Sequence, residues 1–204
     1  MPLTWIAKRM TVQLAVEVST PKRDRLPDPS QDERDTVLAC QRGDLGAYER
    51  IYREHQRSLL GVALRMLGRR EDAEDAVQTT LVRLYRSIDK YRFQSRLGTY
   101  LIRILINVCY DMIEARKRRQ RFDLESTEPV YLPGVDLRLQ LEEAILALPE
   151  RMRACFVLFA VEGFPQKEIA EMLEVSVGTV KVQIFQAKQK LRVLLTDPSK
   201  EASS

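Results

Sequence analysis

Apolar residues recur every three or four positions through most of the chain, which is the spacing of amphipathic helices. Between Asp44, a suitable N-cap, and Gly68, a suitable C-cap, the pattern predicts a helix of about 23 residues. A second helix is predicted over 71–88, and its acidic first turns complement the positive end of the helix dipole. A third is predicted over 99–121, and no strand is expected from there to the C-terminus.

Beyond residue 136 the predicted helices are shorter. The boundaries indicate helices over 137–148, 150–162 and 166–173, and Ser176 is the N-cap of a last helix that reaches about residue 195. Two helices joined by a three-residue turn, the second with a serine cap, are typical of a helix-turn-helix. An apolar stripe on the last helix is expected to pack inward: Val180, Ile184, Ala187, Leu191 and Leu194.

Proline-rich and acidic segments separate these predicted helices into domains. Residues 19–31 hold three prolines and little apolar content, and residues 123–136 hold Pro129, Pro133 and Gly134. A weak alternation of apolar residues over 12–18 is compatible with a short strand. We therefore predict an all-α fold of two small helical domains, organised as a disordered or weakly ordered extension (1–35), a first domain (36–122), a flexible linker (123–136), a second domain (137–195) and a disordered tail (196–204).

Charge is distributed unevenly along the chain. The 204 residues include 33 Lys and Arg against 29 Asp and Glu, a net charge of only +4. Residues 92–122 nevertheless carry eight basic against two acidic side chains, whereas residues 123–150 carry one against seven. A basic block of this kind favours an acidic partner such as nucleic acid, and its sharp end indicates a domain edge near residue 122.

The sequence lacks the residues and motifs that several functional classes require. The chain has one histidine, His55, and three cysteines that are far apart, so no zinc site is expected, and with no secretory signal a reducing cytoplasm is the expected compartment. No run is long and apolar enough for a membrane span. Nucleotide-binding loops and metalloprotease motifs are missing as well. Acidic pairs such as Asp72 and Asp75 suit a solvated or partner-binding face better than a metal, so we expect no catalysis and no cofactor.

Two segments have the composition of nucleic-acid-binding surfaces. The early residues of the last helix would face base edges or phosphates if the helix-turn-helix forms, although a helical hairpin with a solvated face is the alternative. Residues 91–98 interleave aromatic and basic side chains, a mixture that suits unpaired bases. Phe93 and Tyr100 could instead be core aromatics.

The order of these pieces resembles a known family. Glu71–Tyr85 reads EDAEDAVQTTLVRLY and Thr99–Asp111 reads TYLIRILINVCYD, and both resemble region 2 of bacterial sigma factors of the extracytoplasmic-function (ECF) group. Leu148–Arg153 (LPERMR), Glu162–Leu173 (EGFPQKEIAEML) and Val177–Lys181 (VGTVK) resemble region 4 of the same group. The resemblance covers roughly residues 36–122 and 137–195.

The resemblance implies a protein that binds core RNA polymerase and promoter DNA, with an anti-sigma factor as a further partner, and that has no catalysis of its own. The residues implied in polymerase binding are Asp72, Glu74, Asp75, Gln78, Thr79, Leu81 and Arg83. Those implied at the minus-ten element are Tyr91, Arg92, Phe93, Gln94, Arg96, Tyr100, Arg103, Asn107, Asp111, Arg116 and Arg118. Those implied at the minus-thirty-five element are Ser176, Val177, Gly178, Thr179, Lys181, Gln183, Gln186 and Lys188.

Some positions depart from the family pattern. Tyr100 stands where tryptophan is usual, and Thr79 stands where an acidic residue is usual. Gln183 and Gln186 each replace a frequent arginine, so we expect weaker phosphate contact and more readout through amides.

A stand-alone helix-turn-helix regulator remains the alternative function, with a metal-dependent nuclease far behind. Neither alternative accounts for the motifs of residues 71–111.

Overall fold

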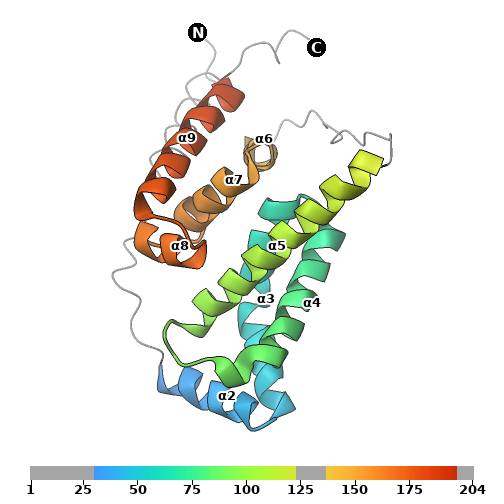
Figure 1. The fold of residues 1–204 in the computed structure, drawn as a ribbon, viewed down its shortest axis with the longest axis vertical. Helices are drawn as coiled ribbons and strands as arrows, with labels where there is room; N and C mark the ends of the chain where they lie inside the picture. The colour runs from blue at the N-terminus through green and yellow to red at the C-terminus, as the bar shows by residue number, and fades with distance from the viewer. Residues whose placement is uncertain (1–29, 123–136, 197–204) are drawn as a thin grey trace. The chain divides into compact units, whose positions relative to one another are not determined.

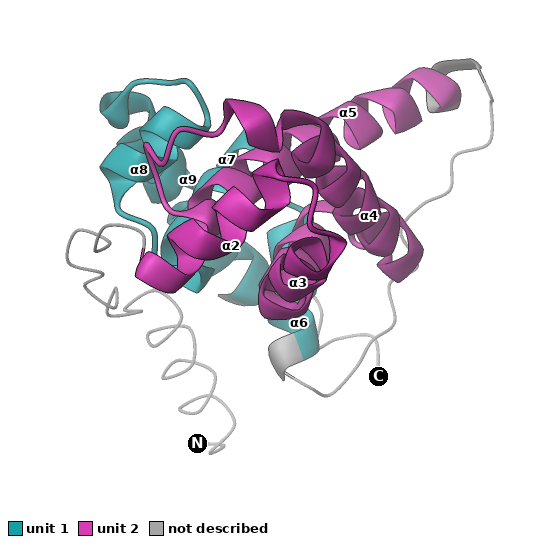
Figure 2. Cartoon of the chain, turned by 90° about the horizontal axis from the view of Figure 1, so that it is seen from below, with its two compact units in different colours: residues 1–23, 128–204 teal, residues 24–127 magenta. Residues whose placement is uncertain are grey.

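The structure of the chain is a computed structural model that describes residues 30–122 and 137–196. Throughout those two ranges the chain forms helices joined by turns and short loops, with no strand, which confirms the all-α prediction. The chain divides into an N-terminal unit that contains residues 30–122 and a C-terminal unit that contains residues 137–196 (Figure 2). The expected linker (123–136) and the strand-like pattern over 12–18 lie outside the described residues.

Four α-helices build the N-terminal unit (Figure 1). They are α2 (Gln31–Gln41), α3 (Leu45–Leu67), α4 (Arg70–Ser87) and α5 (Leu97–Phe122), and a short 3-10 helix, η1 (Ile88–Lys90), follows α4. Helices α3, α4 and α5 pack on one another, and α2 packs against α3 and η1. The core holds fully buried aliphatic side chains from each long helix: Ile51, Leu59, Met66, Leu84, Leu101 and Leu105.

The ends of α3 carry the caps that the sequence predicts. An Asp44 carboxylate oxygen accepts hydrogen bonds from the backbone N–H groups of Gly46 at 2.8 Å and Ala47 at 3.3 Å. Gly68 has φ 81°, and its N–H donates to the Leu64 carbonyl at 2.8 Å. Both caps satisfy backbone groups that a helix end leaves unpaired, so both predicted boundaries of α3 are confirmed.

Helix α2 is an element that the sequence pattern does not predict. It begins at Gln31, so residues 31–35 are helical although they belong to the segment 1–35 that is expected to be weakly ordered. Ser30 is the N-cap, and its hydroxyl oxygen accepts from the Glu33 N–H at 3.1 Å. The apolar side chains of α2 are too few to produce a clear helical stripe. The helix packs instead against α3 and η1, which the sequence pattern does not reveal.

The C-terminal unit consists of α6 (Leu137–Leu146), α7 (Glu150–Phe156), a π-helical turn η2 (Val157–Val161), α8 (Gln166–Met172) and α9 (Val177–Thr196). Helices α6, α7 and α8 pack against α9. Four of the five predicted stripe residues of α9 are buried, but Leu194 is 37% exposed because it lies in the last turn, at the edge of the packed face.

One predicted boundary in this unit is wrong, and one predicted helix changes its hydrogen-bond pattern within its expected length. Helix α6 ends at Leu146 instead of residue 148, and the Arg153 guanidinium of α7 donates to the carbonyls of Leu146 and Leu148, the latter at 2.9 Å. The helix predicted over 150–162 changes to a π-helical turn after Phe156. A π turn widens the hydrogen-bond ring by one residue, which apolar periodicity alone does not reveal.

The cysteines lie in the interior. Cys40, Cys109 and Cys155 are all buried and form no disulfide. Burial raises the pKa of the Cys109 thiol to about 12 and the pKa values of Cys40 and Cys155 to about 11. The three thiols therefore pack as small apolar groups. None of the described helices combines the length and apolar character that crossing a membrane requires.

Candidate polymerase and promoter-DNA interfaces

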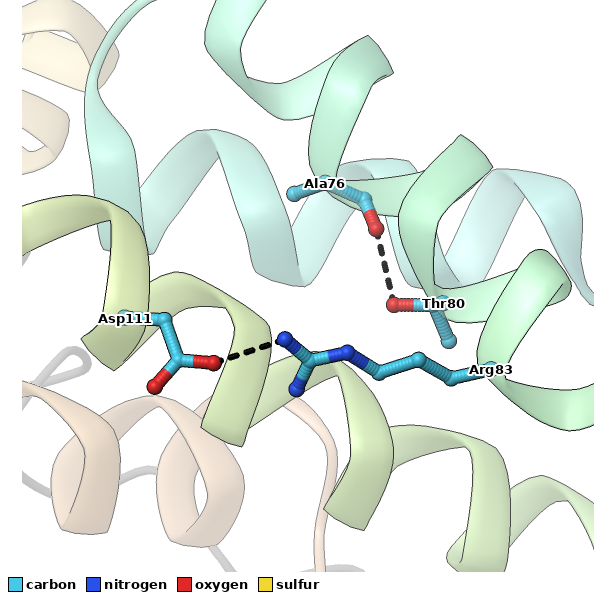
Figure 3. Close-up of polar contacts among 4 residues, drawn as sticks. All are labelled: Ala76, Thr80, Arg83 and Asp111. Atoms are coloured by element: carbon cyan, nitrogen blue, oxygen red, sulfur yellow. Dashed lines mark hydrogen bonds and ion pairs between the residues drawn. The ribbon is translucent and has the colours of Figure 1, made fainter. Parts of the chain in front are cut away.

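Helix α4 has one buried and one exposed face, and the expected polymerase-binding residues lie mostly on the exposed one. Glu74, Asp75, Gln78, Thr79 and Arg83 are exposed, whereas Asp72 and Leu81 are half-buried at the edge of the helix. The opposite face packs inward through Ala73, Ala76, Val77, Thr80 and Leu84. The buried Thr80 hydroxyl donates to the Ala76 carbonyl at 2.8 Å, so it is satisfied inside its own helix (Figure 3).

An ion pair connects α4 with α5. The Arg83 Nη2 donates to the Asp111 Oδ2 at 2.7 Å, and Figure 3 shows the two side chains extending toward each other from their helices. The pair thus joins a residue expected at the polymerase interface to one expected at the minus-ten element. Both side chains are largely exposed, so the pair adds at most about 1 kcal/mol to stability.

The loop 91–96 between η1 and α5 is organised around an aromatic cluster. Tyr91 is buried, and its hydroxyl donates to the Ser95 carbonyl. Its ring centroid lies 5.2 Å from that of Phe93 and 5.0 Å from that of Tyr100. Burial raises the pKa of Tyr91 above its ordinary value. The Tyr91 ring therefore supports the loop from within, whereas Arg92 and Gln94 on the same loop are exposed.

Polar side chains follow one another along the exposed face of α5. Arg103, Asn107 and Asp111 are exposed at four-residue intervals, which places them in one row on the helix. Arg116 and Arg118 are exposed further along, while Phe93, Arg96 and Tyr100 are half-buried. The Tyr100 hydroxyl lies 3.0 Å from the Ser87 hydroxyl of α4. Most of the expected minus-ten residues therefore share the loop and the first half of α5.

The helix-turn-helix forms as predicted. Helix α8 ends at Met172, and the turn contains Glu174 with φ 55°. The Ser176 hydroxyl oxygen accepts from the Thr179 N–H at 3.0 Å, which confirms the serine cap of α9. The Ser176 and Thr179 hydroxyls are also 2.8 Å apart, so each already has a partner within the protein.

Six of the eight residues expected at the minus-thirty-five element are exposed, including Ser176 and Thr179. Val177, Gly178, Lys181 and Gln186 are exposed, but Gln183 is half-buried. Lys188 is half-buried too, and its ammonium lies 5.6 Å from the centroid of the Phe159 ring.

Sequence reasoning missed several exposed residues of α9. Val182 is 52% exposed, Phe185 is 63% exposed, and Gln189 is exposed beside them. They lie opposite the buried stripe, so projecting the stripe onto a helix of 3.6 residues per turn would have found them.

Comparisons with known proteins agree with this geometry. Sigma-70 region 2 matches residues 51–119, and Sigma-70, region 4 matches residues 138–191. The ECF RNA polymerase sigma factor SigE of Mycolicibacterium smegmatis is 31% identical over 192 residues, which cover 86% of this chain and 73% of SigE. SigW of Bacillus subtilis is 30% identical over 178 residues, which cover 79% of this chain and 95% of SigW.

Solved structures share the fold. CnrH, in complex with the cytosolic domain of CnrY, is 24% identical with a TM-score of 0.61, and the match covers 84% of this chain and 99% of CnrH. The sigma factor RpoE of Bartonella quintana, in complex with the anti-sigma factor NepR, is 24% identical with a TM-score of 0.65 over 74% of this chain and 97% of RpoE. With both regions present in this order and relatives that match along most of their length, the chain belongs to the ECF group of the sigma-70 family of RNA polymerase sigma factors.

Proposed function

We propose that the two units divide the work of this sigma factor, which binds core RNA polymerase and directs it to promoters. The N-terminal unit contacts polymerase through α4 and the minus-ten element through the loop 91–96 and α5. The C-terminal unit contacts the minus-thirty-five element through α9. The chain acts by binding alone, in the cytoplasm where polymerase works, and an anti-sigma factor that covers these surfaces would keep it inactive.

The observation that carries this proposal is the separation of exposed side chains onto two different helices of the N-terminal unit. The acidic and polar face of α4 offers Glu74, Asp75 and Gln78, whereas α5 offers the row Arg103, Asn107 and Asp111. An unpaired base needs hydrogen-bonding groups and a fitted surface, worth a few kcal/mol per base, and the α5 row beside the aromatic loop supplies both. Polymerase binding and strand opening should therefore be separable by mutation.

A matched pair of variants tests this separation. Asp75→Lys reverses an exposed charge on α4 and should weaken association with core polymerase while the melting temperature stays unchanged. Asn107→Ala should leave association intact but slow open-complex formation by about tenfold, the loss expected for one good base contact. Binding is measured by titration of core polymerase, and opening by permanganate reactivity of the promoter.

Glu114→Ala, which changes another exposed residue of α5, is the control and should affect neither step. A premelted promoter should restore normal activity to Asn107→Ala. If Asn107→Ala weakens polymerase association as much as opening, the separation of the two surfaces is wrong.

Readout of the minus-thirty-five element is assigned to the exposed face of α9. A glutamine amide can form two hydrogen bonds with an adenine edge, and apolar side chains can contact the thymine methyl group. Gln186 is exposed on the same helix as the exposed Val182 and Phe185, whereas Gln183 is half-buried. The exposed glutamine and apolar side chains therefore suit contacts with A·T base pairs in the major groove better than contacts with phosphates alone.

Three alanine variants separate base contacts from phosphate contacts. Gln186→Ala should change sequence preference, with a loss of about 1 to 3 kcal/mol at one base pair. Gln183→Ala tests the assignment made from the sequence and should have the smaller effect. Lys190→Ala should weaken binding about evenly across sequences and reduce the salt dependence. Binding of the polymerase complex to a library of upstream elements measures all three, and an even loss for Gln186→Ala would contradict its role in base readout.

A further inference from the structure

Helix α2 contacts the loop 91–96 at both of its ends and in its middle. The Gln41 Nε2 donates to the carbonyls of Ile88 at 2.9 Å and Tyr91 at 3.3 Å, where the loop begins. The Glu33 Oε1 accepts from the Leu97 N–H at 2.6 Å, where the loop ends and α5 starts. The bonded residues are 47 to 64 positions apart in the sequence, so a distant helix holds both ends of the loop.

The middle of the loop is held through Phe93. The Arg34 guanidinium of α2 lies 5.2 Å from the centroid of the Phe93 ring, within the range of a cation–π contact. The three contacting residues fall at positions 33, 34 and 41, which occupy one face of α2 together with the fully buried Val37. Figure 1 shows α2 below the connection between α4 and α5. One helix face therefore makes every one of these contacts.

Phe93 also has an unfavourable backbone conformation. Its φ is 57°, in the left-handed region that is unfavourable for a residue with a side chain. Strain of this kind persists only where the surroundings enforce it, and it gathers at functional positions. Phe93 stands between the exposed side chains of Arg92 and Gln94, so its conformation decides where those two side chains point.

We propose that α2 is a positioning element for promoter opening, in which Glu33, Arg34 and Gln41 hold the loop 91–96 in the shape that accepts an unpaired base of the minus-ten element. This inference rests on the proposed role of the loop and α5 at that element. The α2 residues touch no base themselves. They act by fixing the loop before DNA arrives, so that less ordering free energy is lost when the base enters.

The variants Glu33→Ala and Gln41→Ala test this at the two ends of the loop, and either suffices if the other fails to fold. Glu33→Gln keeps an oxygen that can accept from the Leu97 N–H and should behave like the wild type. Asp35→Ala, which changes an exposed residue of the same helix, is the matched control. In the free protein, hydrogen exchange of the Leu97 amide should speed up in Glu33→Ala but not in Asp35→Ala or Glu33→Gln.

The functional readout is base discrimination within the polymerase complex. Promoters substituted at each minus-ten position should be distinguished about tenfold less well by Glu33→Ala and Gln41→Ala, with core polymerase binding unchanged. A uniform loss on all promoters together with weaker polymerase binding would show a merely structural role and overturn the proposal. Unchanged discrimination would overturn it as well.

Asn107→Ala in the same assay distinguishes the positioning role of α2 from the proposed minus-ten interface itself. If Asn107→Ala slows opening while Glu33→Ala and Gln41→Ala retain full discrimination, the positioning role of α2 is wrong and the proposed interface stands. If Asn107→Ala has no effect either, the assignment of this face to the minus-ten element fails, and the inference fails with it.

Discussion

His55 is the single histidine of the chain, and it lies where α3 meets the start of α5. A Cβ atom on Gly98 of α5 would lie 3.4 Å from the imidazole Cε1, so the ring is packed against that backbone. Burial lowers the pKa of His55 below 6.5, and the nearby carboxylates of Glu54 and Glu33 only partly oppose this. The folded protein therefore disfavours the protonated ring.

The sign of the resulting pH dependence follows from proton counting. Between the folded pKa and 6.5 the unfolded chain binds more protons than the folded one, so stability falls as the pH drops below 6.5. We expect the urea midpoint to decrease between about pH 7 and about pH 5.5, and His55→Gln to lose part of that decrease. The same slope in both proteins would show that other groups cause it.

At the scale of one element, Gly61 inside α3 and Gly68 at its C-cap should respond oppositely to substitution. Gly61 is inside the helix, and an added Cβ would lie 3.3 Å from the Arg65 Nη1, which donates to the Gly61 carbonyl at 3.1 Å; the long Arg65 side chain can move the few tenths of an ångström that the Cβ needs. Gly61→Ala should therefore stabilise the protein by about 0.5 to 1 kcal/mol. Gly68 has φ 81°, so Gly68→Ala should destabilise it by about 1 kcal/mol. Urea unfolding measures both free energies, and shifts in the same direction would contradict this account of the cap.

At the scale of the whole molecule, the two units together recognise a promoter only if something sets the distance between them. The 14 residues from 123 to 136 can reach about 45 to 50 Å when extended at about 3.3 Å per residue, and their composition predicts no rigid element. We infer that core polymerase supplies the spacing.

Footprinting at physiological salt tests this inference. The free protein should bind promoter DNA weakly, with steep salt dependence, because mostly phosphate contacts remain. With core polymerase, both the minus-ten and the minus-thirty-five elements should be protected. Full protection of both elements by the free protein would favour a stand-alone helix-turn-helix regulator instead.

Much of the fold could be predicted from the sequence by itself, because helices depend on contacts only three or four residues apart. The period of apolar residues located the long helices, and the caps Asp44, Gly68 and Ser176 marked their ends by hydrogen bonds within one turn. The order of the region 2 and region 4 motifs was enough to indicate the family. None of this requires knowledge of which helices touch.

The tertiary structure decided which side chains are offered to a partner and which support them. Glu33 meets Leu97 across 64 positions, and Arg83 meets Asp111 across 28, distances that no local pattern spans. Tyr91 belongs to a segment whose aromatic and basic residues suit unpaired bases, yet packing buries its side chain. Exposure and pairing result from how separate helices fit together, and the loss of water at each contact depends on that fit.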